Sequence, residues 1–306
     1  MCTQKMAFFF DGTGNGPRGD KLPSNVYKMY DAFEHCGDDS LLSYYFPGPG
    51  ATEYDVFVGQ VFGSSIIDNI KNAYRMLVKD YESPCKIALF GFSRGGYTVH
   101  MFAWLLARCG ISQNLGDCDA IVDRFIENPQ SPDVGTFSTT PSPIIDFIGV
   151  WDIVKSVIPD KDYMDCTLPA SVKNAFHAMA LDELRTFFPV MKWQENGTTQ
   201  LVQEWFAGVH SDIGGGYPSH GLSDIAYKWM QEAVIASGVV SDLMLPNDFR
   251  ECPNQDLNNP FKDNPGWWAF GQCARKYEGE IVHPSVFARH DLVAAYTPEA
   301  SGWHWA

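Results

Sequence analysis

The chain has 306 residues, of which 45% are hydrophobic and 14% aromatic, enough to bury a large core. Its formal net charge of -15 argues against a nucleic-acid partner and against electrostatic attachment to anionic lipid, because both need clustered Lys and Arg. The eight cysteines form no C-x-x-C pair, so we expect buried free thiols rather than a zinc or thioredoxin-type site.

Targeting signals are not evident in the sequence. No amino-terminal stretch combines basic residues, an apolar core and a small-residue cleavage site, and no run approaches the roughly 20 apolar residues of a membrane span. We therefore expect the chain to be made in the cytoplasm, whatever its later destination. Any membrane contact is expected to be transient, local and apolar.

The chain opens with an apolar strand, Met6 to Phe10, that runs into a glycine-rich turn, Asp11 to Gly16. In an open α/β sheet, a turn at the carboxyl end of a strand lies where ligands bind. Two interpretations remain open. The turn is a flexible connection, or its backbone N–H groups near Gly12 and Thr13 supply half of an oxyanion hole, with Asp11 as an accessory residue.

Strands and helices then alternate. Ser24 is a predicted N-cap for a helix that Gly37 stops, residues 41–46 predict a strand, and the apolar spacing over residues 66–81 predicts an amphipathic helix. An uncharged apolar run follows at residues 87–90. This alternation predicts a mainly parallel central sheet with helices on both faces.

The next stretch, Gly91-Phe92-Ser93-Arg94-Gly95, matches the G-x-S-x-G nucleophile elbow. Small residues on both sides allow the serine to occupy a tight, strained turn. The pattern also occurs by chance as an ordinary glycine-rich turn, but the strand before it and the helical spacing after it favour the functional interpretation. We predict that Ser93 is a nucleophile and that the backbone N–H of Arg94 contributes to the oxyanion hole.

After Gly110 the pattern loosens into a short helix near residues 121–126 and a Pro-, Ser- and Thr-rich excursion over residues 128–143. Order returns with a buried strand, residues 144–151, which carries Asp152 at its carboxyl end. When the serine lies on an earlier strand, this is the expected place of the acidic member of a catalytic triad. The alternative is an aspartate that caps the next turn.

Residues 175–188 have a helical composition, and His177 among them is expected to pack rather than to catalyse. The next strand, residues 201–206, opens into a loop with His210 and Asp212 before three consecutive glycines. Glycines let the backbone fold closely beneath an imidazole, so His210 is the predicted general base, with a local loop role as the alternative. If Asp152 is not the acidic member of the triad, Asp212 is the first candidate for that role.

Residues 222–234 predict another amphipathic helix, which Gly238 stops. The rest of the chain is broken by prolines and rich in aromatic residues. We predict one domain over residues 1–306, with a core at about residues 6–238 and a C-terminal segment, residues 239–306, that caps the sheet edge, walls an acyl-chain pocket or only seals the core. His283 in this segment precedes a proline, which suits a packed strand end or a cap residue.

Five motifs together resemble the α/β-hydrolase domain of bacterial type VI secretion phospholipase effectors, the first class of such lipases; in chain order they are FFFDGTGNG, GFSRGGY, FIGVWDIV, HAMALDELRTFFP and FAGVHSDIGGGYP. The resemblance covers about residues 6–217, with a weaker echo at residues 281–285. It implies an α/β-hydrolase fold and a serine hydrolase of ester lipids, with Ser93, Asp152 and His210 in the family's catalytic positions. It also implies a lipid or other ester substrate, secretion into target cells by a type VI system, and an immunity or secretion-apparatus protein as a partner.

The predicted mechanism is acyl transfer, in which His210, oriented by Asp152, takes the proton of Ser93 as the serine attacks an ester carbonyl, and no cofactor is required. Two other classes remain open. Asp11, Asp152, His210 and Asp212 carry groups that could bind a divalent metal ion for phosphoester hydrolysis. The fold could also be a non-catalytic α/β-hydrolase-like module.

Overall fold

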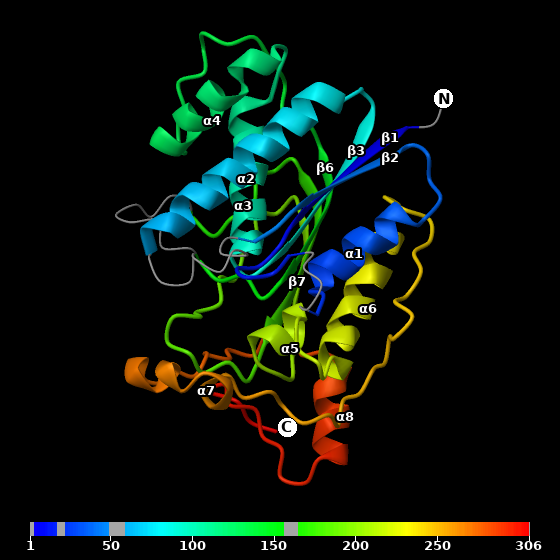
Figure 1. The fold of residues 1–306 in the computed structure, drawn as a ribbon, viewed down its shortest axis with the longest axis vertical. Coiled ribbons are helices and arrows are strands. Elements are labelled where there is room, and N and C mark those ends of the chain that lie inside the picture. Colours follow the sequence, from blue (N-terminus) through cyan, green and yellow to red (C-terminus); the bar gives the residue numbers. More distant parts are fainter. Residues whose placement is uncertain (1–2, 17–21, 49–58, 156–164, 306) are drawn as a thin grey trace.

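The computed structural model describes residues 3–16, 22–48, 59–155 and 165–305. Within these residues, six parallel strands form one sheet in the order β2-β1-β3-β6-β7-β8 (Figure 1). The strands are β1 (Gln4–Phe10), β2 (Leu41–Phe46), β3 (Cys85–Phe92), β6 (Ile145–Trp151), β7 (Val172–Ala180) and β8 (Gln200–Phe206). A separate antiparallel pair joins β4 (Ile111–Ser112) to β5 (Thr139–Thr140).

Helices cover both faces of the sheet. On one face lie α1 (Asn25–Glu34) and α6 (Gly221–Ala236), and on the other α2 (Gly59–Asp80), α3 (Arg94–Cys109) and α4 (Cys118–Glu127) (Figure 1). The predicted fold class, a mainly parallel central sheet between helical layers, is therefore confirmed. The shorter elements are the 3-10 turn η1 (Leu115–Asp117), α5 (His210–Gly214), α7 (Pro260–Asp263), the 3-10 turn η2 (Pro265–Phe270) and α8 (Pro284–Leu292).

The central strands are apolar because both of their faces are buried. In β1, Met6, Phe8 and Phe10 pack into the core beneath α2 and α3, while Ala7 and Phe9 pack into the core beneath α1 and α6. Successive side chains of a strand point to opposite faces, so a strand with helices on both sides needs apolar residues at every position. This explains the uncharged runs that predicted β1 and β3. The strand β6 is apolar apart from Asp146, which accepts a hydrogen bond of 2.7 Å from Lys173.

One predicted element is wrong. The composition of residues 175–188 predicts a helix, but β7 occupies Val172–Ala180 and lies between β6 and β8 in the parallel sheet. Ala, Met and Leu favour a helix locally, and a strand buried on both faces lacks the alternation that would reveal it. His177 packs as predicted, since it is fully buried and its Nε2 accepts a hydrogen bond of 3.1 Å from the Ile153 backbone.

The strand order reverses between β1 and β3, because β2 lies on one side of β1 and all later strands lie on the other. In open α/β sheets, the crevice outside the carboxyl ends of strands at such a reversal is the usual ligand site. The loops that follow β1 and β3 meet there. The fold therefore brings the glycine-rich turn of residues 11–16 to the elbow.

Residues 239–249 pack against the core beneath α1 and α6, and the rest of the C-terminal segment, residues 250–305, lies at the end of the molecule where α5 follows β8 (Figure 1). It packs on the outer edge of the sheet, where Ile281 O accepts a hydrogen bond of 3.0 Å from Trp205 N and His283 N donates one of 2.9 Å to Trp205 O. Val286 and Tyr296 share an apolar cluster with the end of β7. The segment thus continues the hydrogen bonding of β8.

Close backbone approach explains both glycines of the elbow. A Cβ atom on Gly91 would lie 2.6 Å from Gly95 O, and one on Gly95 would lie 2.0 Å from Phe10 O at the end of β1. Both distances are well below van der Waals contact. The β1 loop can therefore touch the elbow only because residue 95 has no side chain.

We predict that Gly95→Ala lowers the free energy of unfolding by about 3 kcal/mol, because its methyl group would force β1 and α3 apart. The matched control is Gly135→Ala, where the nearest atom to the new methyl group would be 3.9 Å away. Thermal unfolding of both variants measures the difference. Equal melting temperatures for the two would contradict the packing argument.

Candidate active site

Ser93 occupies a strained turn between β3 and α3. Its backbone has φ 57° and ψ -125°, an unfavourable conformation for a residue with a side chain, and α3 begins at the next residue, Arg94. The Ser93 amide donates a 3.0 Å hydrogen bond to Trp151 O at the end of β6. This bond ties the elbow to the strand end from which Asp152 projects.

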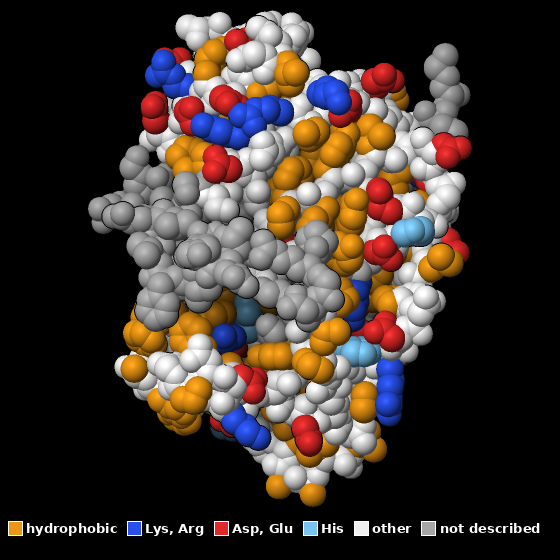
Figure 2. Space-filling view, viewed as in Figure 1, with side chains coloured by type: hydrophobic (Ala, Val, Ile, Leu, Met, Phe, Trp, Pro, Cys, Tyr) orange, Lys and Arg blue, Asp and Glu red, His pale blue; other side chains and the backbone are white. Residues whose placement is uncertain are grey.

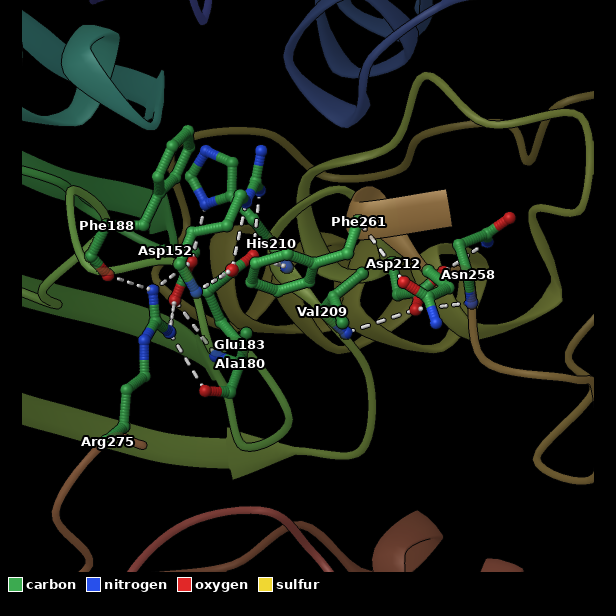
Figure 3. Close-up of polar contacts among 12 residues, drawn as sticks. Asp152, Ala180, Glu183, Phe188, Val209, His210, Asp212, Asn258, Phe261 and Arg275 are labelled. Atoms are coloured by element: carbon green, nitrogen blue, oxygen red, sulfur yellow. Dashed lines mark hydrogen bonds and ion pairs between the residues drawn. The ribbon is translucent and has the colours of Figure 1, made fainter. Parts of the chain in front are cut away.

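Asp152 and His210 form a direct hydrogen-bonded pair. The Nδ1–H of His210 donates to Asp152 Oδ2 at 2.6 Å, and both residues are buried (Figure 3). Asp152 has φ 46°, and its amide donates to Ala178 O at 2.7 Å, so the turn after β6 is fixed to β7. The structure thus brings the predicted acid and base into contact, beside the elbow that carries Ser93.

The imidazole of His210 lies among aromatic rings. Its centroid is 4.6 Å from that of Phe92 and 4.9 Å from that of Phe188. Burial lowers the pKa of His210, although the hydrogen bond and negative charge of Asp152 oppose this shift. The ring is therefore neutral at pH 7, and with Nδ1 protonated its Nε2 is free to accept a proton.

The glycine triplet after His210 allows the close approach that the sequence predicted. A Cβ atom on Gly214 would lie 2.0 Å from the Phe92 ring, and Gly215, with φ 83°, pairs with Ser24 at the start of α1. Side chains at these positions would push α5 away from the elbow. The glycines therefore hold His210 next to β3.

Arg275 is a site residue that the sequence analysis missed. Its Nη1 donates to Asp152 Oδ1 at 2.5 Å and its Nη2 to Asp152 Oδ2 at 2.9 Å (Figure 3). Burial alone would raise the pKa of Asp152, but the charges and hydrogen bonds of Arg275 and His210 outweigh it and hold that pKa well below its ordinary value. No sequence signal marks this arginine, because it lies 123 residues from its partner in an irregular segment.

Two residues of the motif HAMALDELRTFFP also support His210. Glu183 Oε2 accepts a 3.1 Å hydrogen bond from the His210 amide, and Arg185 pairs with Glu183 through its Nε at 2.9 Å and its Nη2 at 2.7 Å. The guanidinium of Arg185 lies 3.6 Å from the centroid of the Phe188 ring, which borders His210. This motif therefore shapes the wall behind the imidazole rather than forming a helix.

The predicted oxyanion-hole residues have different environments. The Gly12 amide donates to the Asp11 carboxylate at 2.7 Å, which engages one of the expected donors. The Thr13 hydroxyl is buried and has no hydrogen-bond partner within the described residues. Because a Cβ on Gly12 would lie 2.7 Å from the Phe92 ring, this loop touches the elbow. Of the residues predicted to donate to an oxyanion, Thr13 in this loop and Arg94 in the elbow therefore remain.

Asp11 and Asp212 lie outside the Asp152–His210 pair. Asp11 accepts hydrogen bonds from Ser24 at 2.7 Å and from Tyr45 at 2.5 Å, and burial raises its pKa to about 6. Asp212 accepts from the Asn258 side chain at 2.5 Å, and burial likewise raises its pKa to about 6 (Figure 3). Asp212 thus links α5 to the C-terminal segment.

The metal-ion alternative required Asp11, Asp212, Asp152 and His210 around one ion. Instead, each of the first two binds its own neutral partners, and Asp152 is paired with a guanidinium. In the part of the chain that the structure describes, no three His, Cys, Asp or Glu side chains are grouped as a metal site would require. The side chains present therefore do not fit that alternative.

His283 also lies apart from the pair. Its ring stacks on Phe206 with centroids 4.4 Å apart, and its Nδ1 accepts a 3.2 Å hydrogen bond from Ser285 N at the start of α8. Burial lowers the pKa of His283 to about 4. His283 is therefore the N-cap of α8 and also hydrogen bonds to β8, in agreement with the prediction of a packed strand end or a cap residue.

Comparison with known proteins agrees with the resemblance seen in the motifs. Residues 4–233 match the family described as "T6SS, Phospholipase effector Tle1-like, catalytic domain". The chain belongs to this family. The Tle1-like match includes Ser93, Asp152 and His210, whereas Arg275 lies beyond it.

Three relatives show the range of this similarity. The uncharacterized protein YEL023C of Saccharomyces cerevisiae is 27% identical over 212 residues, which are 58% of this chain and 31% of the yeast protein. An uncharacterized protein from Pseudomonas aeruginosa has a TM-score of 0.46 and 17% identity, covering 82% of this chain and 47% of that one. The Tle1 effector bound to the VgrG spike has a TM-score of 0.45 and 20% identity, covering 70% of this chain and 51% of that one.

We predict different outcomes for the two histidines. His210→Ala removes the partner of Asp152 and abolishes ester hydrolysis, whereas His283→Ala keeps turnover and lowers the free energy of unfolding by about 1 kcal/mol, because it removes a helix cap. Turnover of a soluble ester and thermal unfolding measure both effects. An inactive His283→Ala protein beside an active His210→Ala protein would place the base in the C-terminal segment.

Proposed function

We propose that the protein is a serine hydrolase that cleaves acyl ester bonds of phospholipids. The observation that carries this proposal is the Asp152–His210 hydrogen bond of 2.6 Å beside a serine held at φ 57° between a buried strand and a helix. Backbone strain of this kind is uncommon in an ordinary strand-to-helix connection and is concentrated at functional sites. Here it occurs beside a neutral imidazole whose orientation is fixed. The Tle1-like family membership supports the same chemistry.

The proposed reaction proceeds through an acyl-enzyme. His210 Nε2 takes the hydroxyl proton of Ser93 as its Oγ attacks the ester carbonyl, and Asp152 stabilises the imidazolium that forms. The proton then passes to the leaving alcohol. Water, activated by the same imidazole, releases the fatty acid and regenerates Ser93.

Donors on both sides of Ser93 would stabilise the oxyanion. The backbone N–H of Arg94 at the start of α3 faces charge that develops at the elbow, and the loop after β1 offers Thr13, whose buried hydroxyl has no other partner among the described residues. A buried donor without a partner is costly in a resting protein. A transition-state oxyanion would remove that cost.

The surface beside His210 favours a lipid substrate. Phe187, Trp268 and Phe270 are 58%, 59% and 54% exposed and, with Trp267, form what we call the rim aromatics. Figure 2 shows hydrophobic side chains gathered at the lower left, over α7 and η2. Exposed aromatic clusters of this kind are typical of protein surfaces that contact lipid or another protein.

The rim aromatics connect to the imidazole. Trp267 lies 5.6 Å from Phe188, and Phe188 lies 4.9 Å from His210, measured between ring centroids. A net charge of -15 disfavours anionic bilayers, so the proposed lipid surface is zwitterionic. An acyl chain leaving such a surface would meet the rings of Trp267 and Phe188, with the Arg185 guanidinium over them, on its way to His210.

None of the helices in the described part of the chain is both long enough and apolar enough to cross a membrane.

We also propose that a type VI secretion apparatus delivers the protein, since the description of its family names that system.

We predict that Ser93→Ala reduces phospholipid hydrolysis in phosphatidylcholine vesicles at least about 10⁴-fold and leaves the melting temperature near that of the parent, because it removes one oxygen and fills no space. Fatty-acid release from the vesicles measures the effect. Unchanged release by the variant would reject the serine-hydrolase assignment. A parent protein without activity on any ester would instead favour a non-catalytic module.

A second prediction concerns the rim aromatics. Replacing Trp268 and Phe270 together by Ser should reduce hydrolysis of vesicle phospholipid about tenfold while leaving hydrolysis of a soluble short-chain ester unchanged, because only interfacial binding is weakened. Phe287→Ser is the matched control, since Phe287 is 49% exposed on α8 and has no ring contact with the rim aromatics. Equal losses on both substrates would show that the cluster does not act at a lipid surface.

A further inference from the structure

The Asp152 carboxylate binds more than its histidine. Arg275 reaches it from the C-terminal segment, outside residues 4–233 that match the family, and Arg275 is only 5% exposed. Both terminal nitrogens of the guanidinium are engaged twice: Nη1 also donates to Ala180 O at 2.8 Å, and Nη2 to Phe188 O at 2.8 Å. The arginine therefore joins Asp152 to the last residue of β7 and to the segment that follows it (Figure 3).

We propose that Arg275 is a positioning residue that fixes the Asp152 carboxylate and offsets its charge, and so sets the orientation and basicity of His210. The inference rests on the proposed triad. It makes the C-terminal segment a part of the catalytic machinery rather than a seal over the core.

The geometry favours a role in orientation. Oδ2 of Asp152 accepts from His210 at 2.6 Å, and Oδ1 accepts from Ala180 N at 2.9 Å. The planar fork of Arg275 contacts both oxygens at once, which fixes the plane of the carboxylate as well as its position. The direction of the His210 Nδ1–H bond is fixed with it.

The arginine itself is held from both ends. Arg275 O accepts hydrogen bonds from Ser301 N at 2.8 Å and Ser301 Oγ at 3.3 Å, and Cys273 N donates to Leu184 O at 2.8 Å. The guanidinium is held by the two carbonyl groups described above. Arg275 therefore keeps its place without a substrate.

The charge of Arg275 acts on the basicity of His210. A buried carboxylate without a compensating cation strongly favours the imidazolium form of its histidine, which would then be protonated and useless as a base at mildly acidic pH. Arg275 offsets that charge through both carboxylate oxygens, including Oδ2, which also accepts from His210.

Other charged groups near His210 are already engaged. Glu183 and Arg185 pair with each other, Asp182 accepts hydrogen bonds from Gly208 N and from Tyr296 and Glu299, and Asp212 accepts from Asn258. His177, the other imidazole near Asp152, is neutral because burial lowers its pKa to about 4. Loss of Arg275 would therefore change the charge balance at Asp152 directly.

The test is the pH dependence of covalent labelling of Ser93 by a fluorophosphonate probe, which needs the triad but no natural substrate. The rate constant is measured from pH 5 to pH 9 for the full-length parent, Arg275→Gln and Arg289→Gln. Arg289 is the matched control, because it is 4% exposed in the same segment and donates to two backbone carbonyls, Pro253 O and Gln255 O, but does not contact Asp152.

The proposal predicts that labelling of Arg275→Gln declines at a higher pH than that of the parent, so that its loss at pH 5.5 exceeds its loss at pH 8 about fivefold. Arg289→Gln should keep the pH profile of the parent even if it is less stable. An equal loss for Arg275→Gln at every pH would overturn the proposal, because a merely structural arginine would not move the profile.

Two further outcomes are decisive. If Arg275→Gln does not fold, Arg275→Lys replaces it. Lysine keeps the charge but not the fork, so a folded Arg275→Lys protein should label several-fold more slowly than the parent, and labelling at the parent rate would overturn the proposal. If the parent itself is not labelled at Ser93, the proposed triad fails, and the present inference fails with it.

Discussion

The site depends on one buried negative charge, the carboxylate of Asp152. A carboxylate that is fully removed from water is stable only if hydrogen bonds and opposite charge replace its solvation. Here the replacements come from His210 in α5, the backbone of β7 and Arg275 near the C-terminus. Elements that are distant in sequence therefore meet at the end of β6, and the same contacts that stabilise the charge orient the imidazole.

The second constraint is close packing around the carboxyl ends of the strands, where only residues without a side chain fit. Gly95 lets the β1 loop reach the elbow, and Gly214 lets α5 lie against Phe92. These contacts hold the β1 loop against Gly95 and α5 against Phe92, so the residues that flank the strained turn at Ser93 are fixed by packing. The geometry of the proposed catalytic site and the packing of the core therefore depend on the same contacts. A change that loosens one of them should loosen the other.

Much of this was visible in the sequence, and the rest was hidden for physical reasons. The strands before Ser93 and Asp152 and the glycines after His210 carry local signals, because burial on both faces and close backbone approach restrict the residue types allowed. The composition of β7 favours a helix, and only the tertiary structure makes it a strand. Arg275 was missed because an ion pair between distant residues leaves no periodicity or motif. The Glu183–Arg185 pair lies inside the motif HAMALDELRTFFP, but its contact with His210 follows from the strand conformation of β7, which the local composition does not show.

A crystal structure of the protein after reaction with a phosphonate ester would show whether Ser93 is the nucleophile. We expect a covalent bond between phosphorus and Ser93 Oγ, and a phosphoryl oxygen within hydrogen-bond distance of the Arg94 N–H and of Thr13. We also expect His210 Nε2 to face the ester oxygens while Nδ1 stays on Asp152. An adduct on any other residue would refute the proposed triad. So would a Ser93 adduct whose phosphoryl oxygen points away from both donors.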